Sequence, residues 1–502
     1  MQVEPGLESF VARCESGAAQ LVWTRLVSDL ETPVSAFLKL AGSRRNAFLF
    51  ESVEGGAVRG RYSMIGFDPD LIFRHHGGAA EIARLPDLAR FDPCPGHSLT
   101  ALRALIVESR IAVPEGLPPM AAGIFGYLAY DTARLMEELP PMKRAGIDAP
   151  DAVLIRPRIV AIFDSVKDEL TIVTPVRPDP ELQARAAYDR AVNRLIEVVD
   201  ALDRPLDHST APADLALSGE VASNTKPAEY RRMVARAKDY IRAGDIFQVV
   251  LSQRFEAPFP LPAFALYRAL RRINPSPFLY YLDFDGFSIV GSSPEILVRA
   301  REGKVTIRPI AGTRPRGVTS VEDRRLGAEL LADPKERAEH LMLLDLGRND
   351  AGRVSKLGSV RVTDQFFLER YSQVMHIVSN VEGELRADCD ALDALIAGFP
   401  AGTVSGAPKI RAMQIIDELE KERRGPYAGC VGYFSADGEM DTCIVLRTAV
   451  VKDGVMYVQA GAGIVADSDP DSEQAECVNK AKALFRAADE ARRFASQAGR
   501  GQ

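Results

Sequence analysis

The chain has 502 residues, of which 46% are hydrophobic and 26% are charged, and this ordinary globular composition argues against long disordered segments. Its 62 lysine and arginine residues and 69 aspartate and glutamate residues give a formal charge of −7, which argues against nucleic acid or an anionic membrane as the main partner. The six cysteines are scattered without a C-x-x-C pair, which excludes a zinc knuckle or a disulfide scaffold and favours the reducing cytoplasm.

No uncharged stretch is long enough to span a membrane, and the first five residues lack the basic and apolar regions of a signal peptide. The six histidines are also scattered. Any bound metal is therefore expected to be a hard cation held by carboxylates.

The N-terminal part is predicted to contain strands at residues 47–50, 153–163 and 170–173 and an amphipathic helix over 182–202. A polar, proline-punctuated stretch at 204–214 follows and is typical of a linker. A second helix is predicted to begin at Thr225-Lys-Pro227, with Thr225 as its N-cap, and to end at Gly244.

Further strands are predicted at residues 248–255, 288–291, 430–434, 443–451 and 455–460. The helices fall in blocks between pairs of strands rather than alternating with them one for one. This order favours an α+β fold with largely antiparallel sheets flanked by helices. We predict two closely packed parts, residues 1–205 and residues 225–490.

One candidate site lies at residues 461–480. Asp469-Pro470 is a helix start signal, and Glu473, Glu476 and Lys480 would share one face of that helix. Taken alone, this face is also typical of a solvated surface. The glycines at 461 and 463 favour a ligand, because glycines near a strand let the backbone approach one closely. A dinucleotide site is rejected, because an acidic turn at 467–469 would repel a pyrophosphate.

A second candidate is the predicted helix after Asp333, which places Glu336, Glu339 and His340 on one face. Carboxylates from two helices suit Mg²⁺, although surface salt bridges explain the same spacing.

The arginine-flanked Gly312-Thr313 turn would bind an anion or be merely an exposed basic turn. The small-residue loop at 402–409 reads equally as a tight turn or a substrate wall. His376 lies in an apolar stretch, where a lone histidine is more often a hydrogen-bonded core residue than a catalyst.

At these residues the chain resembles the chorismate-binding enzymes, and among them those that make anthranilate. The matching stretches occur in the family's order across about 225–490: Ile310–Gly317, Glu339–Asp350, Phe399–Lys409 and Gly461–Pro470. The N-terminal part matches less strongly, through Phe50–Ser52 and Arg61–Gly66. The resemblance implies the corresponding fold, chorismate as substrate and Mg²⁺ as cofactor.

The resemblance also implies roles for individual residues. Glu339 and Glu476 are similar to the family's metal ligands, with Glu473 as an outer-shell carboxylate. His376, Thr403 and Glu336 match positions next to the reacting ring, and His376 is expected to transfer a proton in the elimination of pyruvate. The implied substrate contacts are Gly312, Thr313, Tyr427, Arg447, Gly461, Ala462, Gly463 and Lys480.

Two positions indicate what attacks the substrate. Relatives that use water have a lysine base where this chain has Gln248, and many aminodeoxychorismate synthases have a lysine nucleophile where it has Ala311. The chain therefore needs free ammonia, which a separate glutamine amidotransferase subunit would supply, to make anthranilate for tryptophan biosynthesis. Aminodeoxychorismate synthesis is the alternative, since some of those enzymes lack the lysine. A ligand-binding regulatory paralogue is a third possibility, but it would predict a damaged set of metal ligands.

The resemblance further implies feedback inhibition by tryptophan. Glu51 and Ser52 resemble one half of the family's inhibitor site, and Pro277, Phe278 and Leu279 resemble the other half. Glu51 is expected to pair with the α-ammonium group, and residues 277–279 are expected to form an apolar wall for the indole. Without the resemblance, a strand end and a proline turn explain these residues equally well.

Overall fold

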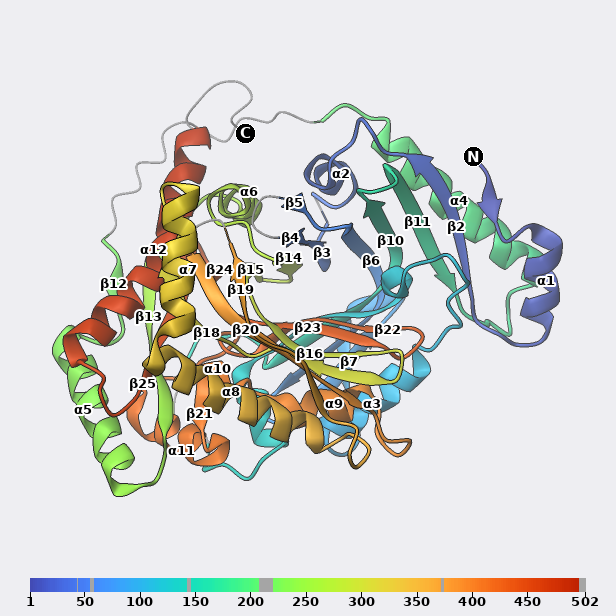
Figure 1. Cartoon of the computed structure of the whole chain (residues 1–502). Helices are drawn as coiled ribbons and strands as arrows, with labels where there is room; N and C mark the ends of the chain where they lie inside the picture. The colour runs from blue at the N-terminus through green and yellow to red at the C-terminus, as the bar shows by residue number, and fades with distance from the viewer. Residues whose placement is uncertain (43, 55–57, 142–145, 207–219, 372–373, 496–502) are drawn as a thin grey trace.

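The structure is a computed structural model of the chain that describes residues 1–42, 44–54, 58–141, 146–206, 220–371 and 374–495 (Figure 1). The predicted linker falls largely on residues 207–219, which lie outside the described residues. No helix in the described part combines the length and the apolarity that a membrane crossing requires.

The first part of the chain carries four α-helices, two 3-10 helices and eleven strands within its described residues. The helices are α1 (Leu7–Glu15), α2 (Pro33–Leu40), α3 (Ser98–Glu108), η1 (Pro119–Ala121), η2 (Tyr130–Leu135) and α4 (Ala184–Leu202). The strands are β1 (Val3–Glu4), β2 (Gln20–Val27), β3 (Ala47–Glu51), β4 (Val53–Glu54), β5 (Val58–Arg59), β6 (Tyr62–His76), β7 (Ala79–Arg84), β8 (Asp87–Pro93), β9 (Gly123–Leu128), β10 (Ala152–Asp164) and β11 (Glu169–Val176).

The second part carries the remaining helices and strands. The helices are α5 (Pro227–Ala243), α6 (Ala263–Ile273), α7 (Ser320–Ala332), α8 (Pro334–Gly352), α9 (Ala391–Gly398), α10 (Gly402–Ser405), α11 (Lys409–Leu419) and α12 (Pro470–Ala495). The strands are β12 (Ala222–Ser223), β13 (Gln248–Pro258), β14 (Phe278–Phe284), β15 (Phe287–Ser293), β16 (Ile296–Arg301), β17 (Lys304–Ile307), β18 (Ile310–Pro315), β19 (Arg361–Arg370), β20 (Val374–Glu384), β21 (Gly406–Ala407), β22 (Cys430–Ser435), β23 (Met440–Ile444), β24 (Thr448–Lys452) and β25 (Val455–Ile464).

The predicted α+β class is confirmed, because the strand pairs of the described residues are antiparallel and helices flank them. Figure 1 shows α5, α7 and α12 together on one side of the molecule and α1 and α4 on the opposite side. Strands of the two predicted parts pair directly: β3 pairs with β14, with Glu51 opposite Leu279, and β9 pairs with β22. The division at 205–225 stays a prediction.

Local sequence signals account for several element ends. Helix α12 begins at Pro470, and the Asp469 carboxylate accepts a hydrogen bond from the Ser472 N–H at 2.9 Å, as expected for an N-cap. Helix α5 ends at Gly244, whose φ of 84° lies in the left-handed region that favours glycine.

Three local predictions are wrong. The N-cap of α5 is Lys226 rather than Thr225, and the Lys226 N–H donates to the Glu229 carboxylate at 2.9 Å. The predicted strand at 443–451 is two strands, β23 and β24, because Arg447 adopts a φ of 47° between them. Gly312-Thr313 is not a turn but part of β18, where a bulge lies at Gly312 with a φ of 71°.

Candidate active site

Two paired strands form one wall of the candidate site. Strand β25 places Gly461 opposite Ser252 of β13, and Gly463 opposite Val250. A Cβ atom at Gly461 would lie 2.9 Å from the Tyr427 hydroxyl, and one at Gly463 would lie 2.6 Å from the side-chain nitrogen of Gln248. Glycine is therefore required at both positions, because a side chain would displace polar groups that border the site. Ala462, between them, is fully buried.

Acidic side chains from α8 face this wall. The Gln248 Nε2 donates to the Glu339 Oε1 at 3.0 Å, so the start of β13 and the N-terminal half of α8 are in contact. Burial raises the pKa of Glu339, and the negative charges of Glu336 and Glu476 raise it further. The Gln248 side chain is 3% exposed, and its Oε1 has no hydrogen-bond partner among the described residues.

Helix α12 contributes the second group of charges. The Lys480 Nζ donates to the Glu476 carboxylate at 2.7 Å and to the Gly461 carbonyl at 3.0 Å, so it ties the helix to the glycine strand. Burial raises the pKa of Glu473, and the charge of Glu476 acts in the same direction. Carboxylates of α8 and α12 thus repel one another across a shared space.

This arrangement fits the predicted Mg²⁺. No group of three metal-binding side chains converges within the described part of the chain. Mg²⁺ commonly takes only one or two protein carboxylates and completes its shell with water and an anionic substrate. Glu339 and Glu476, whose negative charges interact, are a suitable pair, because a dication between them would offset that repulsion.

Glu336, predicted to act at the reacting ring, is held by a salt bridge. The Arg314 Nη1 donates to its Oε1 at 2.8 Å. Its other oxygen lies 3.0 Å from the position that a Cβ would take at Gly312, so the side chain borders the bulge of β18. Glu336 therefore lies beside the predicted substrate contacts, with its charge offset by Arg314.

His376 lies on β20, directly opposite Thr313 of β18. Its Nδ1 is 2.9 Å from the Gly312 carbonyl and 3.1 Å from the Thr313 hydroxyl, whereas its Nε2 is buried without a partner among the described residues. Burial lowers the pKa of His376 to about 4, and the positive charges of Arg447 and Lys480 act in the same direction. A neutral imidazole that donates from Nδ1 presents Nε2 as a proton acceptor.

Thr403 contacts a candidate functional residue that the sequence did not reveal. The Thr403 hydroxyl, in α10, donates to the Glu295 carboxylate at 2.9 Å. Burial raises the pKa of Glu295 to about 7, although Thr403, Arg447 and Lys480 act in the opposite direction. A carboxyl with such a pKa can remain protonated near neutral pH and donate its proton. In the sequence, Glu295 stands out only as the one charged residue within residues 287–298.

Arg447 and Tyr427 complete the wall that faces Glu295 and Gly461. Burial lowers the pKa of Arg447, and the negative charge of Glu295 opposes this effect. Burial raises the pKa of Tyr427, so its hydroxyl remains a hydrogen-bond donor. Two cationic side chains, Arg447 and Lys480, therefore stand among carboxylates at this site, which suits a substrate that is itself an anion.

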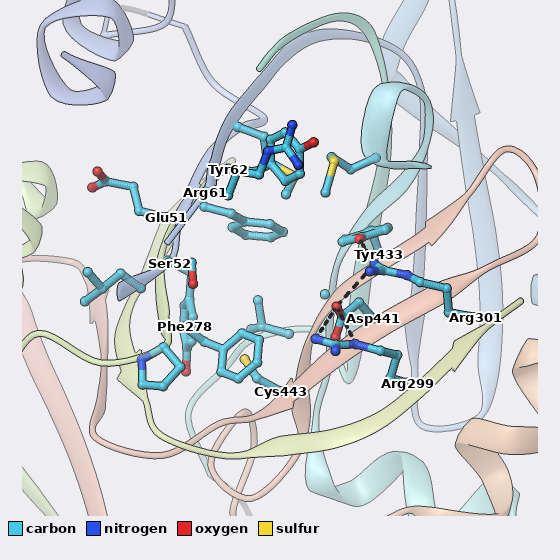
Figure 2. Close-up of a pocket in the computed structure, with 18 residues that line it drawn as sticks. Glu51, Ser52, Arg61, Tyr62, Phe278, Arg299, Arg301, Tyr433, Asp441 and Cys443 are labelled. Carbon is cyan, nitrogen blue, oxygen red and sulfur yellow. Dashed lines mark hydrogen bonds and ion pairs between the residues drawn. The ribbon is translucent and has the colours of Figure 1, made fainter. Parts of the chain in front are cut away.

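A separate cavity of about 280 Å³ lies at the junction between β3 and β14 (Figure 2). All five residues predicted to bind an inhibitor line it: Glu51, Ser52, Pro277, Phe278 and Leu279. Polar residues of β16, β22 and β23 line the opposite wall, including Arg299, Arg301, Tyr433 and Asp441.

The expected role of Glu51 in this cavity does not match its geometry. Its two oxygens accept hydrogen bonds from Arg271 at 2.6 and 2.9 Å, and Tyr267 donates to one of them. Figure 2 shows its carboxylate directed away from the aromatic residues of the cavity. Asp441, on the opposite wall, is also paired with arginines: one of its oxygens lies 2.9 Å from Arg299 and 3.5 Å from Arg301, whereas the other is buried without a partner in the described chain.

A family model described as a chorismate binding enzyme matches residues 46–486. The chain belongs to the chorismate-binding enzyme family, as its motifs indicated. Within that family it is similar to anthranilate synthase component 1 over nearly its whole length. The protein of that name from Cereibacter sphaeroides is 57% identical over 496 residues, which cover 98% of this chain and 99% of the relative. The one from Aquifex aeolicus is 47% identical over 467 residues, which cover 93% and 94%.

Solved structures agree with this assignment. The crystal structure of anthranilate synthase component I from Streptococcus pneumoniae shares 36% sequence identity and a TM-score of 0.76, and the match covers 92% of this chain and 99% of that one. The menaquinone-specific isochorismate synthase of Escherichia coli shares the fold at 21% identity, with a TM-score of 0.68 and coverage of 96% and 98%. The family resemblance and the fold predicted from it are thus confirmed, and the relatives named anthranilate synthase component 1 support the role of an aminating subunit.

Proposed function

We propose that this chain converts chorismate and ammonia to anthranilate and pyruvate, as the aminating subunit of an Mg²⁺-dependent anthranilate synthase in tryptophan biosynthesis. The observation that carries the proposal is the environment of Gln248. This buried amide lies beside Glu339, at the position where water-using relatives have a lysine. Ala311 occupies the other lysine position, so neither side chain supplies a nucleophile or a strong base.

Ammonia suits the site beside Gln248 and Ala311, where other family members have lysines. The unpartnered Oε1 of Gln248 is a buried acceptor, and an NH₃ molecule can donate a hydrogen bond to it while its lone pair stays free to attack. Free NH₃ is already a good nucleophile, and a buried site strips it of competing water. In the first step NH₃ adds to the ring at C2 and the C4 hydroxyl leaves as water.

The side chains are suited to hold the substrate for that step. Arg447 and Lys480 would bind its carboxylates, and the protonated Glu295, oriented by Thr403, would give its proton to the leaving hydroxyl. Bound by Glu339 and Glu476, Mg²⁺ would supply counter-charge for the substrate carboxylate. Glu473 would lie outside that shell.

The second step makes the ring aromatic. The amino intermediate loses the proton on C2 and its enolpyruvyl side chain, which departs as pyruvate. The neutral His376 can accept the C2 proton at its free Nε2, while its Nδ1–H stays fixed by the Gly312 carbonyl. The pKa of about 4 keeps this imidazole unprotonated at physiological pH, so its Nε2 is available to accept a proton.

Two partners complete the proposal. A separate glutamine amidotransferase subunit supplies ammonia, and tryptophan inhibits from the cavity between β3 and β14. Both acids that line this cavity, Glu51 and Asp441, are paired with arginines, but Asp441 keeps one oxygen without a partner among the described residues, and we assign that oxygen to the α-ammonium group of tryptophan. Phe278 and the neighbouring proline are suited to contact the indole.

Aminodeoxychorismate synthesis is the second candidate, because Ala311 leaves that outcome open. The product separates the two: anthranilate is fluorescent and forms with release of pyruvate, whereas aminodeoxychorismate keeps its side chain. The proposal predicts fluorescence and one pyruvate per product when the purified chain is mixed with chorismate, Mg²⁺ and an ammonium salt. An amino product without pyruvate supports the second candidate instead.

A further inference from the structure

We propose that Arg424 is a positioning residue that holds three substrate-facing segments of this site in register: Thr403 of α10, the Gln248 end of β13, and Tyr427. The inference rests on the proposed function, since it concerns the same reaction. Arg424 lies between α11 and β22, is 2% exposed, and contacts none of the predicted substrate groups through a hydrogen bond.

The guanidinium of Arg424 joins two backbone carbonyls that are distant in sequence. Its Nη1 donates to the Val404 carbonyl at 2.6 Å, and its Nη2 donates to the Val250 carbonyl at 2.6 Å. Val404 directly follows Thr403, whose hydroxyl orients Glu295. The position of the Thr403–Glu295 pair is therefore tied to strand β13.

The second carbonyl leads to the opposite wall. Val250 lies two residues after Gln248 and pairs with Gly463 of β25. A shift of Val250 would consequently move both the amide proposed to receive ammonia and the glycine strand proposed to contact the substrate. Arg424 thus fixes the distance between Gln248, on the side where ammonia would attack, and the Thr403–Glu295 pair, on the side where the hydroxyl would leave.

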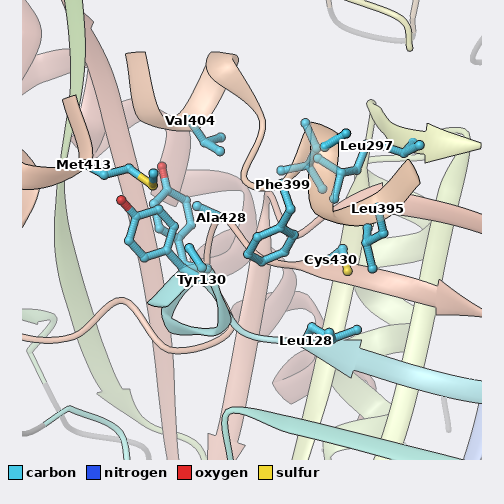
Figure 3. Packing of buried hydrophobic residues seen from close by; sticks show 14 of the residues in the cluster. Leu128, Tyr130, Leu297, Leu395, Phe399, Val404, Met413, Ala428 and Cys430 are labelled. Carbon is cyan, nitrogen blue, oxygen red and sulfur yellow. The ribbon is translucent and has the colours of Figure 1, made fainter. Parts of the chain in front are cut away.

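The aromatic neighbours of Arg424 extend this link. Its guanidinium carbon lies 5.6 Å from the centre of the Tyr427 ring and 4.7 Å from that of Tyr130. Figure 3 shows Tyr130, Val404 and Met413 close together in the packed hydrophobic core. The Tyr427 hydroxyl lies close to Gly461, so the contact of Arg424 with the Tyr427 ring also positions the third segment.

The charge of Arg424 is compensated by Glu420, while other N–H groups of Arg424 donate to the two backbone carbonyls. Glu420 accepts from Arg424 at 2.6 and 3.0 Å and also from the Ser252 N–H and hydroxyl at 2.7 and 2.9 Å. Four of the five Arg424 N–H groups thus have acceptors, and these bonds offset part of the cost of burying both charges. A lysine would keep the charge, but only a planar fork reaches acceptors on three sides in fixed directions.

The test is the Arg424→Lys variant, assayed with chorismate, Mg²⁺ and ammonium beside wild type, Thr403→Val and the double variant. We expect kcat to fall about tenfold or more, with the KM for chorismate changed by less than about threefold, because orientation rather than binding is lost. We also expect the double variant to keep a kcat well above the value obtained by multiplying the two single losses, because both substitutions act on the Thr403–Glu295 pair.

Arg156→Lys is the matched control, because Arg156 is also a buried arginine bound to two acids, Asp70 and Glu108, but lies in the first part of the chain. It should lower the melting temperature without lowering kcat. If Arg424→Lys does not fold, Glu420→Gln takes its place, and a kcat loss of about threefold that is non-additive with Thr403→Val is expected.

An unchanged kcat, or additive effects of the two substitutions, overturns the positioning role while leaving the proposed function intact. A wild-type chain that forms no anthranilate overturns the proposed function, and the positioning role with it.

Discussion

Glu295 and His376 face the same two cations, Arg447 and Lys480, but burial shifts their pKa values in opposite directions. Burial raises the pKa of the carboxyl to about 7 and lowers that of the imidazole to about 4. Near neutral pH the first residue can give a proton and the second can accept one. Such a divergence of environments is how enzymes assign acid and base roles to neighbouring groups.

The first prediction concerns the acid. Because deprotonation of Glu295 removes the proton donor, kcat/KM for chorismate, measured at a fixed NH₃ concentration, should fall as pH rises above about 7. The corresponding fall of kcat should occur at a higher pH, because the bound dianion disfavours the ionised form of Glu295 and so raises its pKa. A full pH profile for wild type and Glu295→Gln measures both effects.

Glu295→Gln should lower kcat about a hundredfold or more and remove this alkaline limb of the pH profile, because an amide cannot supply the proton. Thr403→Val should move the limb to higher pH, since the Thr403 hydrogen bond lowers the pKa of Glu295. A wild-type limb that persists in Glu295→Gln would assign the titration to another group.

The second prediction concerns the base. His376→Ala should slow aromatisation more than amination, so an aminated, non-aromatic intermediate should accumulate. Rapid quenching followed by mass analysis detects that species. His376→Gln keeps a polar group opposite Thr313 and controls for the loss of packing. Equal slowing of both steps without an intermediate would contradict this role for His376.

At the scale of elements, α8 and α12 each bring a carboxylate to one space. The third prediction is that Glu339→Gln or Glu476→Gln lowers turnover about a hundredfold or more and weakens Mg²⁺ binding in calorimetry, because an amide is a poorer ligand for a hard dication. Glu329→Gln in α7 removes a carboxylate of an exposed ion pair and should change neither quantity. Near-normal turnover of either variant at saturating Mg²⁺ would remove these residues as ligands.

Element ends with strong local signals were predictable from the sequence. The Asp469-Pro470 start of α12 and the Gly244 end of α5 depend on caps that act within a few residues. The break at Arg447 and the bulge at Gly312 were not predictable, because their conformations depend on strands paired across the sheet. For the same reason Glu295 was missed, since its partner Thr403 is 108 residues away.

At the scale of the whole molecule, the candidate inhibitor cavity is formed where β3 of the first part meets β14 of the second. The family resemblance implied that Ser52 and Phe278 lie together, and both line this cavity, but it could not show that Glu51 is already bound by Arg271. That ion pair joins β3 to α6 and depends on tertiary packing. The sequence therefore predicted the location of the cavity better than its polar contacts.

The fourth prediction is that tryptophan inhibits the ammonia-dependent reaction of wild type but has little effect on Ser52→Phe, whose larger side chain fills part of the cavity. The uninhibited rates should be similar, and the coupling should amount to about 1–3 kcal/mol. Indole-3-propionate, which lacks the α-ammonium group, should inhibit more weakly if Asp441 receives that group. A wild-type enzyme unaffected by millimolar tryptophan would refute the inhibitor site.

The central claim is that free ammonia, not water or glutamine, attacks chorismate in this chain. Its most direct test is mass analysis of the products when the purified chain is mixed with chorismate, Mg²⁺ and ¹⁵N-labelled ammonium, and separately with ¹⁵N-labelled glutamine. The account predicts singly labelled anthranilate and an equal amount of pyruvate from ammonium, and no labelled product from glutamine. Isochorismate, an amino product that retains its side chain, or labelled anthranilate from glutamine would contradict it.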